Sequence, residues 1–402
     1  MISTRKMNQQ SAALAMKSPL KKLALTVTAL LSLTVTADAC TRVLFHGDNE
    51  RNITARSMDW KRDVGTNLWI LPQGIERNGE AGDRSIAWTA KYGSVVATGY
   101  DIATTDGMNE AGLNANLLWL VESDYPPPMN SDKPTLALSL WAQYMLDNFA
   151  TVAEAVEFLE TEPFVVVTAH VPGENRLATL HLSLSDRFGD SAIVEYIDGK
   201  QVIHHDRSYQ VMTNSPTFDK QLALNEYWQE IGGTTMLPGT NRAADRFARA
   251  AFYINAIPKD GNERDTFAGV FSVIRNVSVP YGLNTEEEPN ISSTRWRTVI
   301  DHQAGRYFFE SAISPSIFWV DLNKVDFKPG ADVKKLDLGK DQSNIFSGEV
   351  SGEFVTTAPF KFLGITEEQL QAAIKQEEAL KTVLDAEEEA VFEEPAVSAP
   401  QS

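Results

Sequence analysis

The chain has 402 residues, of which 43% are hydrophobic, a formal net charge of −18 at pH 7 and a single cysteine, Cys40. A strongly acidic chain is a poor nucleic-acid binder, and a single cysteine excludes an intramolecular disulfide. The sequence contains no Cys/His cluster with zinc-ligand spacing and no glycine-rich phosphate loop. We therefore expect no metal, no other cofactor and no nucleic-acid partner.

Residues 1–39 have the pattern of a cleaved secretory signal peptide. Three lysines precede an apolar run: Lys17, Lys21 and Lys22. The run covers residues 23–35, which is too short to span a bilayer comfortably, and Ala37-Asp38-Ala39 then matches the small-x-small cleavage pattern. Cleavage removes five basic residues and Asp38, so a periplasmic or secreted chain beginning at Cys40 carries a formal charge of −22. No second apolar run has membrane length, so we expect no stable membrane insertion.

A lipoprotein signal is the alternative interpretation of the same segment. It would leave Cys40 acylated and the protein anchored in the periplasm with a vestigial site. Such a signal usually has Leu three positions before the cysteine and small residues between. Here Ala37 holds the Leu position and Asp38 follows it. The mass of the mature N-terminus distinguishes the two interpretations.

Strand patterns dominate the start of the mature chain. Short runs of β-type residues bounded by turn residues predict strands at residues 41–45, 52–56, 67–71, 85–91 and 94–99. Residues 106–112 predict a turn, and residues 113–120 a strand. Four side chains share one face of that strand: Leu113, Ala115, Leu117 and Trp119.

Helices and strands then alternate in blocks. Apolar residues at helical spacing predict helices at residues 136–149, 151–159, 245–257 and 264–274. Further strands are predicted at residues 164–170, 178–183, 191–197, 209–214, 294–301, 306–310 and 317–322. Because sheet-forming stretches flank two pairs of helices, we expect sheets packed face to face with helices outside.

The C-terminal residues 363–402 differ from the rest. A helix is predicted over residues 366–394, and residues 395–402 are expected to be disordered. Four apolar residues lie near one side of this acidic helix: Leu370, Ile374, Leu380 and Leu384. The stripe docks the helix either on its own domain or on another subunit. We therefore divide the chain into a leader (1–39), a main domain (40–362) and an acidic helical extension (363–402).

Cys40 is the candidate nucleophile. An idle thiol in an oxidising compartment tends to be oxidised, whereas a thiol on residue one can act with its own α-amine as the base. An amide hydrolase of this kind also needs a cation beside the thiol and donors for the oxyanion. Suitable residues recur near the ends of predicted elements: Arg56, Asp59, Asn214 and Arg246. Composition and spacing alone do not single them out, because such residues commonly form surface ion pairs and turns.

Five motifs give these residues a context. They are Cys40-Thr41-Arg42, Ala55-Arg56-Ser57-Met58-Asp59-Trp60, Asp106-Gly107-Met108-Asn109-Glu110 with Gly112-Leu113, Thr213-Asn214-Ser215-Pro216-Thr217-Phe218-Asp219, and Leu237-Pro238-Gly239 with Arg246-Phe247. In this order they resemble the choloylglycine hydrolase family of N-terminal-nucleophile hydrolases, which includes bile salt hydrolases and penicillin V acylases. The resemblance implies an α+β fold with four αββα layers, and hydrolysis of linear amides in residues 40–362.

The resemblance also implies a role for each site residue. Cys40 supplies the nucleophile and the amine, and Arg56 stabilises the thiolate. Asp59 accepts a hydrogen bond from the α-ammonium and orients it. Asn214 donates its side-chain amide to the oxyanion, and Arg246 adds positive charge. By family analogy the partners are a small acyl amide substrate and further copies of the chain, in a homo-oligomer that we expect to be a tetramer.

Trp119 departs from part of the family. Its backbone N–H matches the second oxyanion donor, but bile salt hydrolases resemble one another in having Asn there, and Gram-positive penicillin V acylases have Tyr. Trp119 together with Trp60 resembles the Gram-negative penicillin V acylase branch. An aromatic wall favours a phenoxyacetyl or aliphatic acyl group, so both tryptophans are candidate substrate-binding residues. Acyl-homoserine-lactone acylase and bile salt hydrolase activity remain alternatives, as does plain core packing of Trp119.

Overall fold

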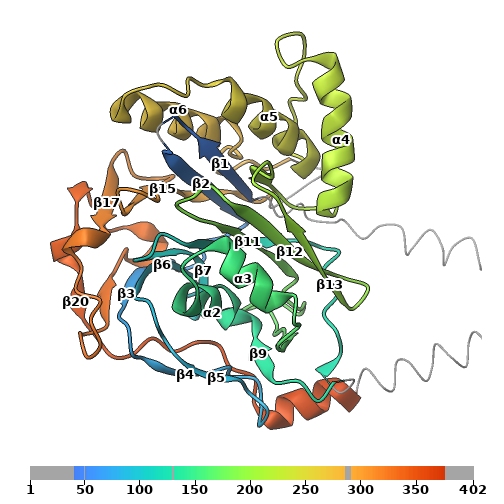
Figure 1. The fold of residues 1–402 in the computed structure, drawn as a ribbon, viewed down its shortest axis with the longest axis vertical. Helices are drawn as coiled ribbons and strands as arrows, with labels where there is room; N and C mark the ends of the chain where they lie inside the picture. The colour runs from blue at the N-terminus through green and yellow to red at the C-terminus, as the bar shows by residue number, and fades with distance from the viewer. Residues whose placement is uncertain (1–39, 49, 129–130, 286–290, 376–402) are drawn as a thin grey trace, which may run out of the picture. The chain divides into compact units, whose positions relative to one another are not determined.

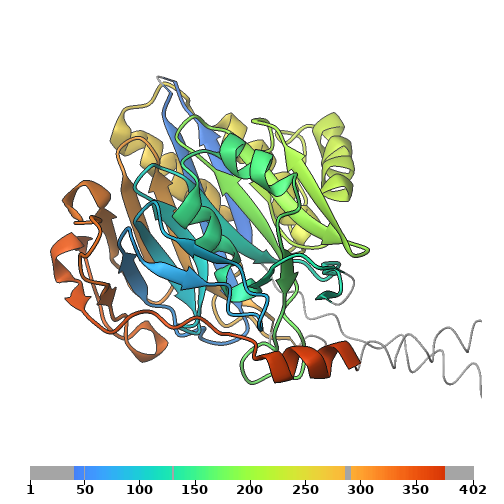
Figure 2. The same ribbon diagram turned by 60° about the horizontal axis from the view of Figure 1, so that its bottom comes forward.

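Two large β-sheets with helices on their outer faces make up most of the described chain (Figures 1 and 2). The computed structural model describes residues 40–48, 50–128, 131–285 and 291–375. All of them belong to one unit, residues 37–402. The layers run helices, sheet, sheet, helices, which confirms the expected αββα arrangement.

The first sheet begins immediately after Cys40. Its strand order is β14-β1-β2-β15-β16-β17-β19, and within the described strands of this sheet only the pairing of β17 with β19 is parallel. Its strands are β1 (Thr41–His46), β2 (Asn52–Trp60), β14 (Val211–Met212), β15 (Ser293–Asp301), β16 (Arg306–Ser311), β17 (Ile317–Asp321) and β19 (Gly348–Glu349). β1 is therefore an interior strand, paired on both sides.

The second sheet has the order β13-β12-β11-β8-β7-β6-β3-β18-β20. Its strands are β3 (Leu68–Leu71), β6 (Ser94–Gly99), β7 (Ala103–Asn109), β8 (Asn114–Trp119), β11 (Leu180–Ser185), β12 (Ser191–Ile197), β13 (Lys200–His205), β18 (Lys334–Leu336) and β20 (Val355–Thr356). Two small pairs lie apart from it: β4 (Glu76–Asn78) with β5 (Ala87–Thr89), and β9 (Thr135–Ala137) with β10 (Val165–Val167).

Helices cover the two outer faces (Figure 1). On the first sheet lie α5 (Ala243–Ala256) and α6 (Glu263–Asn276), and α4 (Phe218–Ile231) lies beside α5. On the second sheet lie α2 (Trp141–Asn148) and α3 (Val152–Leu159). Four short 3-10 helices are also described: η2 (Leu138–Leu140), η3 (Leu322–Lys324), η4 (Lys340–Gln342) and η5 (Ser351–Glu353). Among the described helices, none combines the length and apolar character that crossing a bilayer requires.

Two clusters of buried side chains hold the layers together. One fills the space between the sheets and under α5 and α6, and includes Phe45, Met108 and Phe267. The other lies between the second sheet and α2 and α3, and includes Trp141 and Leu184. Cys40 belongs to the first cluster.

Most predicted elements are present, but some boundaries are wrong. Residues 106–109 end strand β7, so the predicted turn is confined to residues 110–112, where Gly112 has φ +92°. The predicted helix at 136–149 starts only at Trp141, because β9 and a 3-10 turn precede it. The sequence pattern missed five strands, β4, β13, β18, β19 and β20, and the helix α4. α4 buries Gln221 and Asn225 beside Phe218, so its buried face lacks an apolar stripe.

The C-terminal segment, residues 357–375, follows β20 and ends in a helix over residues 367–375 (Figure 2). Leu370 and Ile374 are buried in the second cluster. Thr366 and Gln369 form a reciprocal cap at the start of this helix. The described part of the extension thus docks on its own domain, whereas the predicted helix beyond residue 375 and its C-terminus lie outside the described residues.

Candidate active site

Strand pairing brings Cys40 between two of the predicted site residues. β1 pairs with β2 in a register that sets Thr41 against Ser57 and Arg42 against Arg56. Cys40, one residue before Thr41, is only 3% exposed. Its Sγ lies 3.9 Å from Arg56 Nη2 and 3.9 Å from the carbonyl oxygen of Asp59. Because side chains alternate along β2, Arg56 and Asp59 point to opposite faces of the sheet.

Arg56 is held rigidly beside the thiol. Its Nη1 donates to the Thr105 carbonyl at 2.8 Å and its Nη2 to the Leu117 carbonyl at 2.9 Å. The Asp106 carboxylate lies 3.8 Å away. Burial raises the pKa of the Cys40 thiol, and the charge of Arg56 is the largest influence that lowers it. Arg56 therefore favours the thiolate that burial disfavours.

Asp59 is buried on the helix-facing side. It accepts hydrogen bonds from Thr294 Oγ1 and from Ser57 Oγ. Burial raises the pKa of Asp59 to about 6, and Arg246 is the strongest influence in the other direction. The Cys40 nitrogen, which is an amide while residues 1–39 are attached, does not donate to Asp59 but to Asn214 Oδ1 at 2.7 Å.

Asn214 follows β14 and has a fixed amide orientation. Its Oδ1 accepts from the Cys40 N–H and from Arg246 Nη2, at 2.7 Å each. Its Nδ2 donates to the Trp119 carbonyl at 2.6 Å. Because the Cys40 and Arg246 donors both need an acceptor, they fix the side-chain oxygen on their side, and the amide nitrogen is directed toward Trp119.

Arg246, in the first turn of α5, binds the backbone of the nucleophile. Its Nη1 donates to the Cys40 carbonyl at 2.6 Å and to Thr41 Oγ1, and its Nε donates to the Asn241 carbonyl at 2.9 Å. Burial lowers the pKa of Arg246, and Asp59 opposes that effect. The structure thus brings all five predicted residues together: Cys40, Arg56, Asp59, Asn214 and Arg246.

The backbone of Trp119 points toward this group. The Leu120 N–H donates to the Thr179 carbonyl, and Trp119 is the partner of Leu180 in the next register position. In an antiparallel pair the hydrogen-bonded positions alternate, so the N–H and C=O of Trp119 point away from β11. The C=O meets Asn214, and the N–H lies on the same edge of β8.

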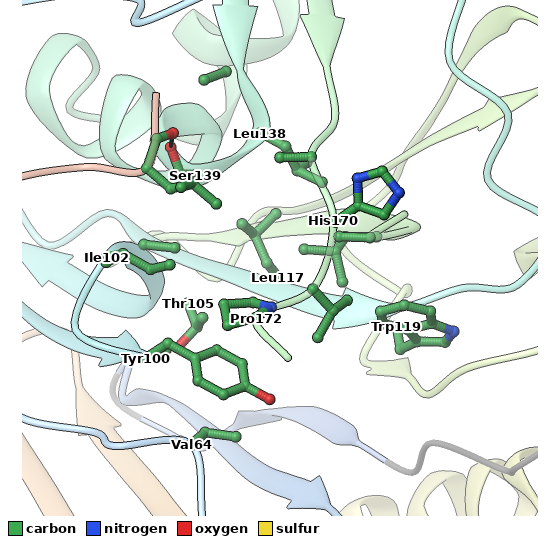
Figure 3. Close-up of a pocket in the computed structure, with 18 of the residues that line it drawn as sticks. Val64, Tyr100, Ile102, Thr105, Leu117, Trp119, Leu138, Ser139, His170 and Pro172 are labelled. Atoms are coloured by element: carbon green, nitrogen blue, oxygen red, sulfur yellow. Dashed lines mark hydrogen bonds between the residues drawn. The ribbon is translucent and has the colours of Figure 1, made fainter. Parts of the chain in front are cut away.

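An apolar cavity of about 130 Å³, part of whose lining is drawn in Figure 3, adjoins Cys40 and Arg56. Its walls come from different parts of the chain: Tyr100 and Ile102 after β6, Leu138 of η2, and His170 and Pro172 between β10 and β11. Such a cavity suits an uncharged acyl group more than a charged one.

Trp60 and Trp119 form one wall of the cavity as a contacting pair. Their ring centroids are 5.5 Å apart, and each side chain is 6% exposed. Trp60 Nε1 donates to Tyr100 OH at 2.8 Å. Arg176 lies over the Trp119 ring, with Cζ 4.1 Å from the centroid. Both tryptophans belong to the first core cluster and also line the cavity, so packing and contact with a ligand are compatible.

Sequence reasoning missed an ion-pair cluster near this wall. Glu174 accepts from Lys61 Nζ at 2.9 Å, Arg62 Nη2 at 2.9 Å and Arg176 Nε at 2.7 Å. Lys61 and Arg62 directly follow Trp60 in the sequence. These two charges beside a predicted site strand were the one signal from which the ion-pair cluster could have been predicted. Across the part of the chain that the structure describes, no group of three or more His, Cys, Asp or Glu side chains is placed to hold a metal ion.

The family model described as linear amide C–N hydrolases, choloylglycine hydrolase family, matches residues 40–339. The chain belongs to this family. The match begins at Cys40, the residue that directly follows the predicted cleavage pattern. It confirms the predicted family and makes the protein a hydrolase of linear amides.

Relatives within the family place the chain near the penicillin V acylases. It is 56% identical over 363 residues to penicillin V acylase of Pectobacterium atrosepticum, covering 85% of this chain and 96% of that one. The solved structure of penicillin V acylase from Agrobacterium tumefaciens is 65% identical, with a TM-score of 0.76, covering 81% of this chain and all of the other. Bile salt hydrolase/transferase of Clostridium perfringens is more distant, at 25% identity over 328 residues, 75% of this chain and 97% of that one.

Proposed function

We propose that the protein, cleaved before Cys40, is an acylase that removes a phenoxyacetyl or aliphatic acyl group from a penicillin V-like amide. One observation carries the proposal: the Cys40 thiol lies 3.9 Å from Arg56 Nη2 and lines an apolar cavity whose wall includes the contacting pair Trp60 and Trp119. The identity to proteins named penicillin V acylase supports the same acyl class.

Acylation starts when the free α-amine of Cys40 takes the thiol proton. The thiolate, beside Arg56, attacks the amide carbonyl and forms a C–S bond. Asn214 Nδ2 donates one of its two hydrogens to the Trp119 carbonyl. Its second hydrogen, together with the Trp119 N–H, donates to the oxyanion. The α-ammonium then protonates the leaving nitrogen as the C–N bond breaks.

Deacylation reverses the proton path. Water gives a proton to the α-amine and attacks the thioester, which releases the carboxylic acid and restores the thiol. Arg246 does not touch the reacting atoms in this scheme, whereas Asp59 contacts the amine that transfers the proton. Asp59 orients the ammonium once cleavage has created it, and Arg246 fixes the Cys40 carbonyl and the Asn214 amide.

The deciding experiment compares three substrates with purified protein whose N-terminus has been sequenced. Penicillin V should be hydrolysed with a higher kcat/KM than glycocholate, and a long-chain acyl-homoserine lactone is the second candidate because its alkyl chain suits the same apolar walls. Preference for glycocholate would overturn the proposed acyl class.

Cys40→Ala should give a folded protein with no turnover above background, because both steps pass through the sulfur. A matched chain that retains Ala39 keeps the sulfur but leaves its nitrogen an amide, and it should also be inactive. Turnover by either variant would contradict the scheme.

We also propose export to the periplasm and assembly into a homo-oligomer, on the leader pattern of residues 1–39 and on family analogy respectively. Mass spectrometry of the mature N-terminus tests the first: an unmodified Cys40 supports it, whereas a diacylated one supports the lipid-anchored alternative. The mass in solution tests the second, and a monomer would rule it out.

A further inference from the structure

The C-terminal segment, residues 357–375, reaches the substrate cavity although the family match ends at residue 339. Leu363 and Ile365 both line the cavity beside Cys40. The segment follows β20, which is the edge strand of the second sheet. Part of the acyl pocket thus lies outside the portion of the chain that defines the family.

Backbone hydrogen bonds hold Leu363 in place. Its N–H donates to the Ile102 carbonyl at 2.8 Å, and its carbonyl accepts from Ser139 Oγ at 2.8 Å. Two residues on, the Ile365 N–H donates to the Glu80 carbonyl at 2.7 Å. Ile102 and Ser139 are themselves cavity residues.

The helix that follows anchors the segment independently of the cavity. Leu370 is 3% exposed and packs in the second core cluster, but it does not line the cavity. Asp83 N–H donates to the Glu367 carboxylate at 2.9 Å. The segment is therefore a fixed wall, tied by backbone pairing at the cavity and by apolar packing beyond it.

This wall lies across the cavity from Trp119, since Leu363 is hydrogen-bonded to Ile102 and Ser139. The Trp119 carbonyl binds the Asn214 amide that also binds the Cys40 nitrogen, so Trp119 lies near the nucleophile. In Figure 3, Ile102 and Ser139 lie on the side of the cavity opposite Trp119. An acyl chain that has its carbonyl at Cys40 and fills this cavity therefore meets a wall that includes Leu363 and Ile365.

We propose that Leu363 and Ile365 set the maximum acyl length that the pocket accepts. This inference rests on the proposed acylase function and adds the residues that determine its specificity. A bulky side chain in the wall leaves no room for an acyl carbon beyond it. An acyl chain that is too short to touch the wall loses the apolar contact that the wall offers. Each additional buried methylene increases kcat/KM about fourfold until the wall is reached.

The test measures kcat/KM on a series of straight-chain acyl amides of one chromogenic amine, each a methylene longer than the one before. Wild type should show an optimum length and a sharp fall beyond it. Leu363→Ala and Ile365→Ala should move the optimum to longer chains, with a gain of about fourfold per added methylene. Leu363→Trp should move it to shorter chains.

Leu370→Ala is the matched control, because it loosens the same segment without removing a cavity wall. It should lower thermal stability and leave the optimum where wild type has it. Equal shifts in Leu370→Ala and Leu363→Ala, or no shift in either Leu363 variant, would overturn the inference. If Leu363→Ala does not fold, Ile365→Ala and Leu363→Trp decide the same question. A wild-type enzyme that hydrolyses none of the series would instead contradict the proposed function.

Discussion

Arg246 orients the side-chain amide of Asn214, the proposed oxyanion donor. It donates to Asn214 Oδ1 and to the Cys40 carbonyl from a single planar group. Two parallel donors in fixed geometry distinguish Arg from Lys, which presents a compact charge. Arg246 is therefore a positioning residue for the oxyanion donor.

Arg246→Lys should lower kcat at least tenfold with a smaller change in KM, because the Asn214 amide loses one of the two donors that orient it. Arg249→Lys is the matched control on the same helix, since Arg249 donates to the carbonyls of Pro238 and Thr240. Steady-state kinetics of both variants gives the answer, and equal losses of kcat would argue against a positioning role.

A buried histidine couples stability to pH. His302 donates from Nδ1 to the Gly112 carbonyl at 2.8 Å, and its Nε2 lies 2.7 Å from Thr54 Oγ1. Burial lowers the pKa of His302 to about 4. In the unfolded chain the ring takes up a proton at its ordinary pKa near 6.5, so the unfolded state binds more protons between the two values.

The free energy of unfolding should accordingly fall as the pH drops from about 6.5 to 4, by about 3 kcal/mol from this group alone. His302→Gln lacks the titrating ring, so its stability should be lower at pH 7 but should decline less steeply. Urea unfolding across this pH range tests the expectation. Parallel curves for the two proteins would contradict it.

The loop between β10 and β11, at residues 168–179, is the element that closes the tryptophan side of the cavity. His170 and Pro172 line the cavity, and Glu174 ties the loop to Arg62 beyond β2. Burial alone would raise the pKa of Glu174, but hydrogen bonds from the surrounding cations, Lys61 first, lower it to about 2. The carboxylate thus remains charged at neutral pH.

Glu174→Gln should raise KM severalfold with little change in kcat, because the loop and the Arg176 guanidinium over Trp119 lose their common partner. The wild-type KM should rise with ionic strength, since these partly exposed pairs are screened by salt, and the variant should have lost that dependence. Glu162→Gln removes a surface pair with Lys133 and serves as control. A salt response unchanged in Glu174→Gln would exclude the loop as its source.

At the scale of elements, periodicity predicted the strands and helices with a continuous apolar face. It failed for elements that bury polar side chains. α4 buries polar Gln221 and Asn225, and β7 carries Asp106 and Asn109 into the interior, so neither has the pattern that local rules require. Both lie next to site residues, where polar side chains are needed inside.

At the scale of the whole domain, Asp106 connects the two sheets and the site. From β7 it accepts from Asn116 Nδ2 at 2.6 Å within its own sheet, and from Thr298 Oγ1 at 3.1 Å and Tyr307 OH in the other. Arg56 lies 3.8 Å away. The Asp106 carboxylate therefore joins the two sheets by hydrogen bonds, and its negative charge offsets the positive charge of Arg56 beside the thiol.

Asp106→Ala should cost about 3–5 kcal/mol of unfolding free energy, because it leaves the buried charge of Arg56 without its partner. Asp106→Asn should be milder and should lower the pKa of the Cys40 thiol, since it removes a negative charge that offsets Arg56. The pH dependence of thiol alkylation measures this effect. Asp147→Asn, in the separate buried network with Arg77 and Gln143, should destabilise without changing alkylation.

The site was only partly predictable from sequence. Cys40 could be identified because the chain has one cysteine and a cleavage pattern ends before it. Arg246 binds a residue 206 positions away, and no local pattern encodes such a contact, so its position required a family resemblance. Leu363 and Glu174 had neither a pattern nor a motif, since their roles arise only when distant segments close over one cavity.

β1 starts one residue after the nucleophile and is paired on both sides. A strand in that position has no freedom to slide, because a shift by one residue would exchange the side chains of its two buried faces. We therefore expect changes of acyl specificity to arise in the loops and the chain terminus that wall the pocket, while this strand keeps its place, as is common for folds that host several chemistries.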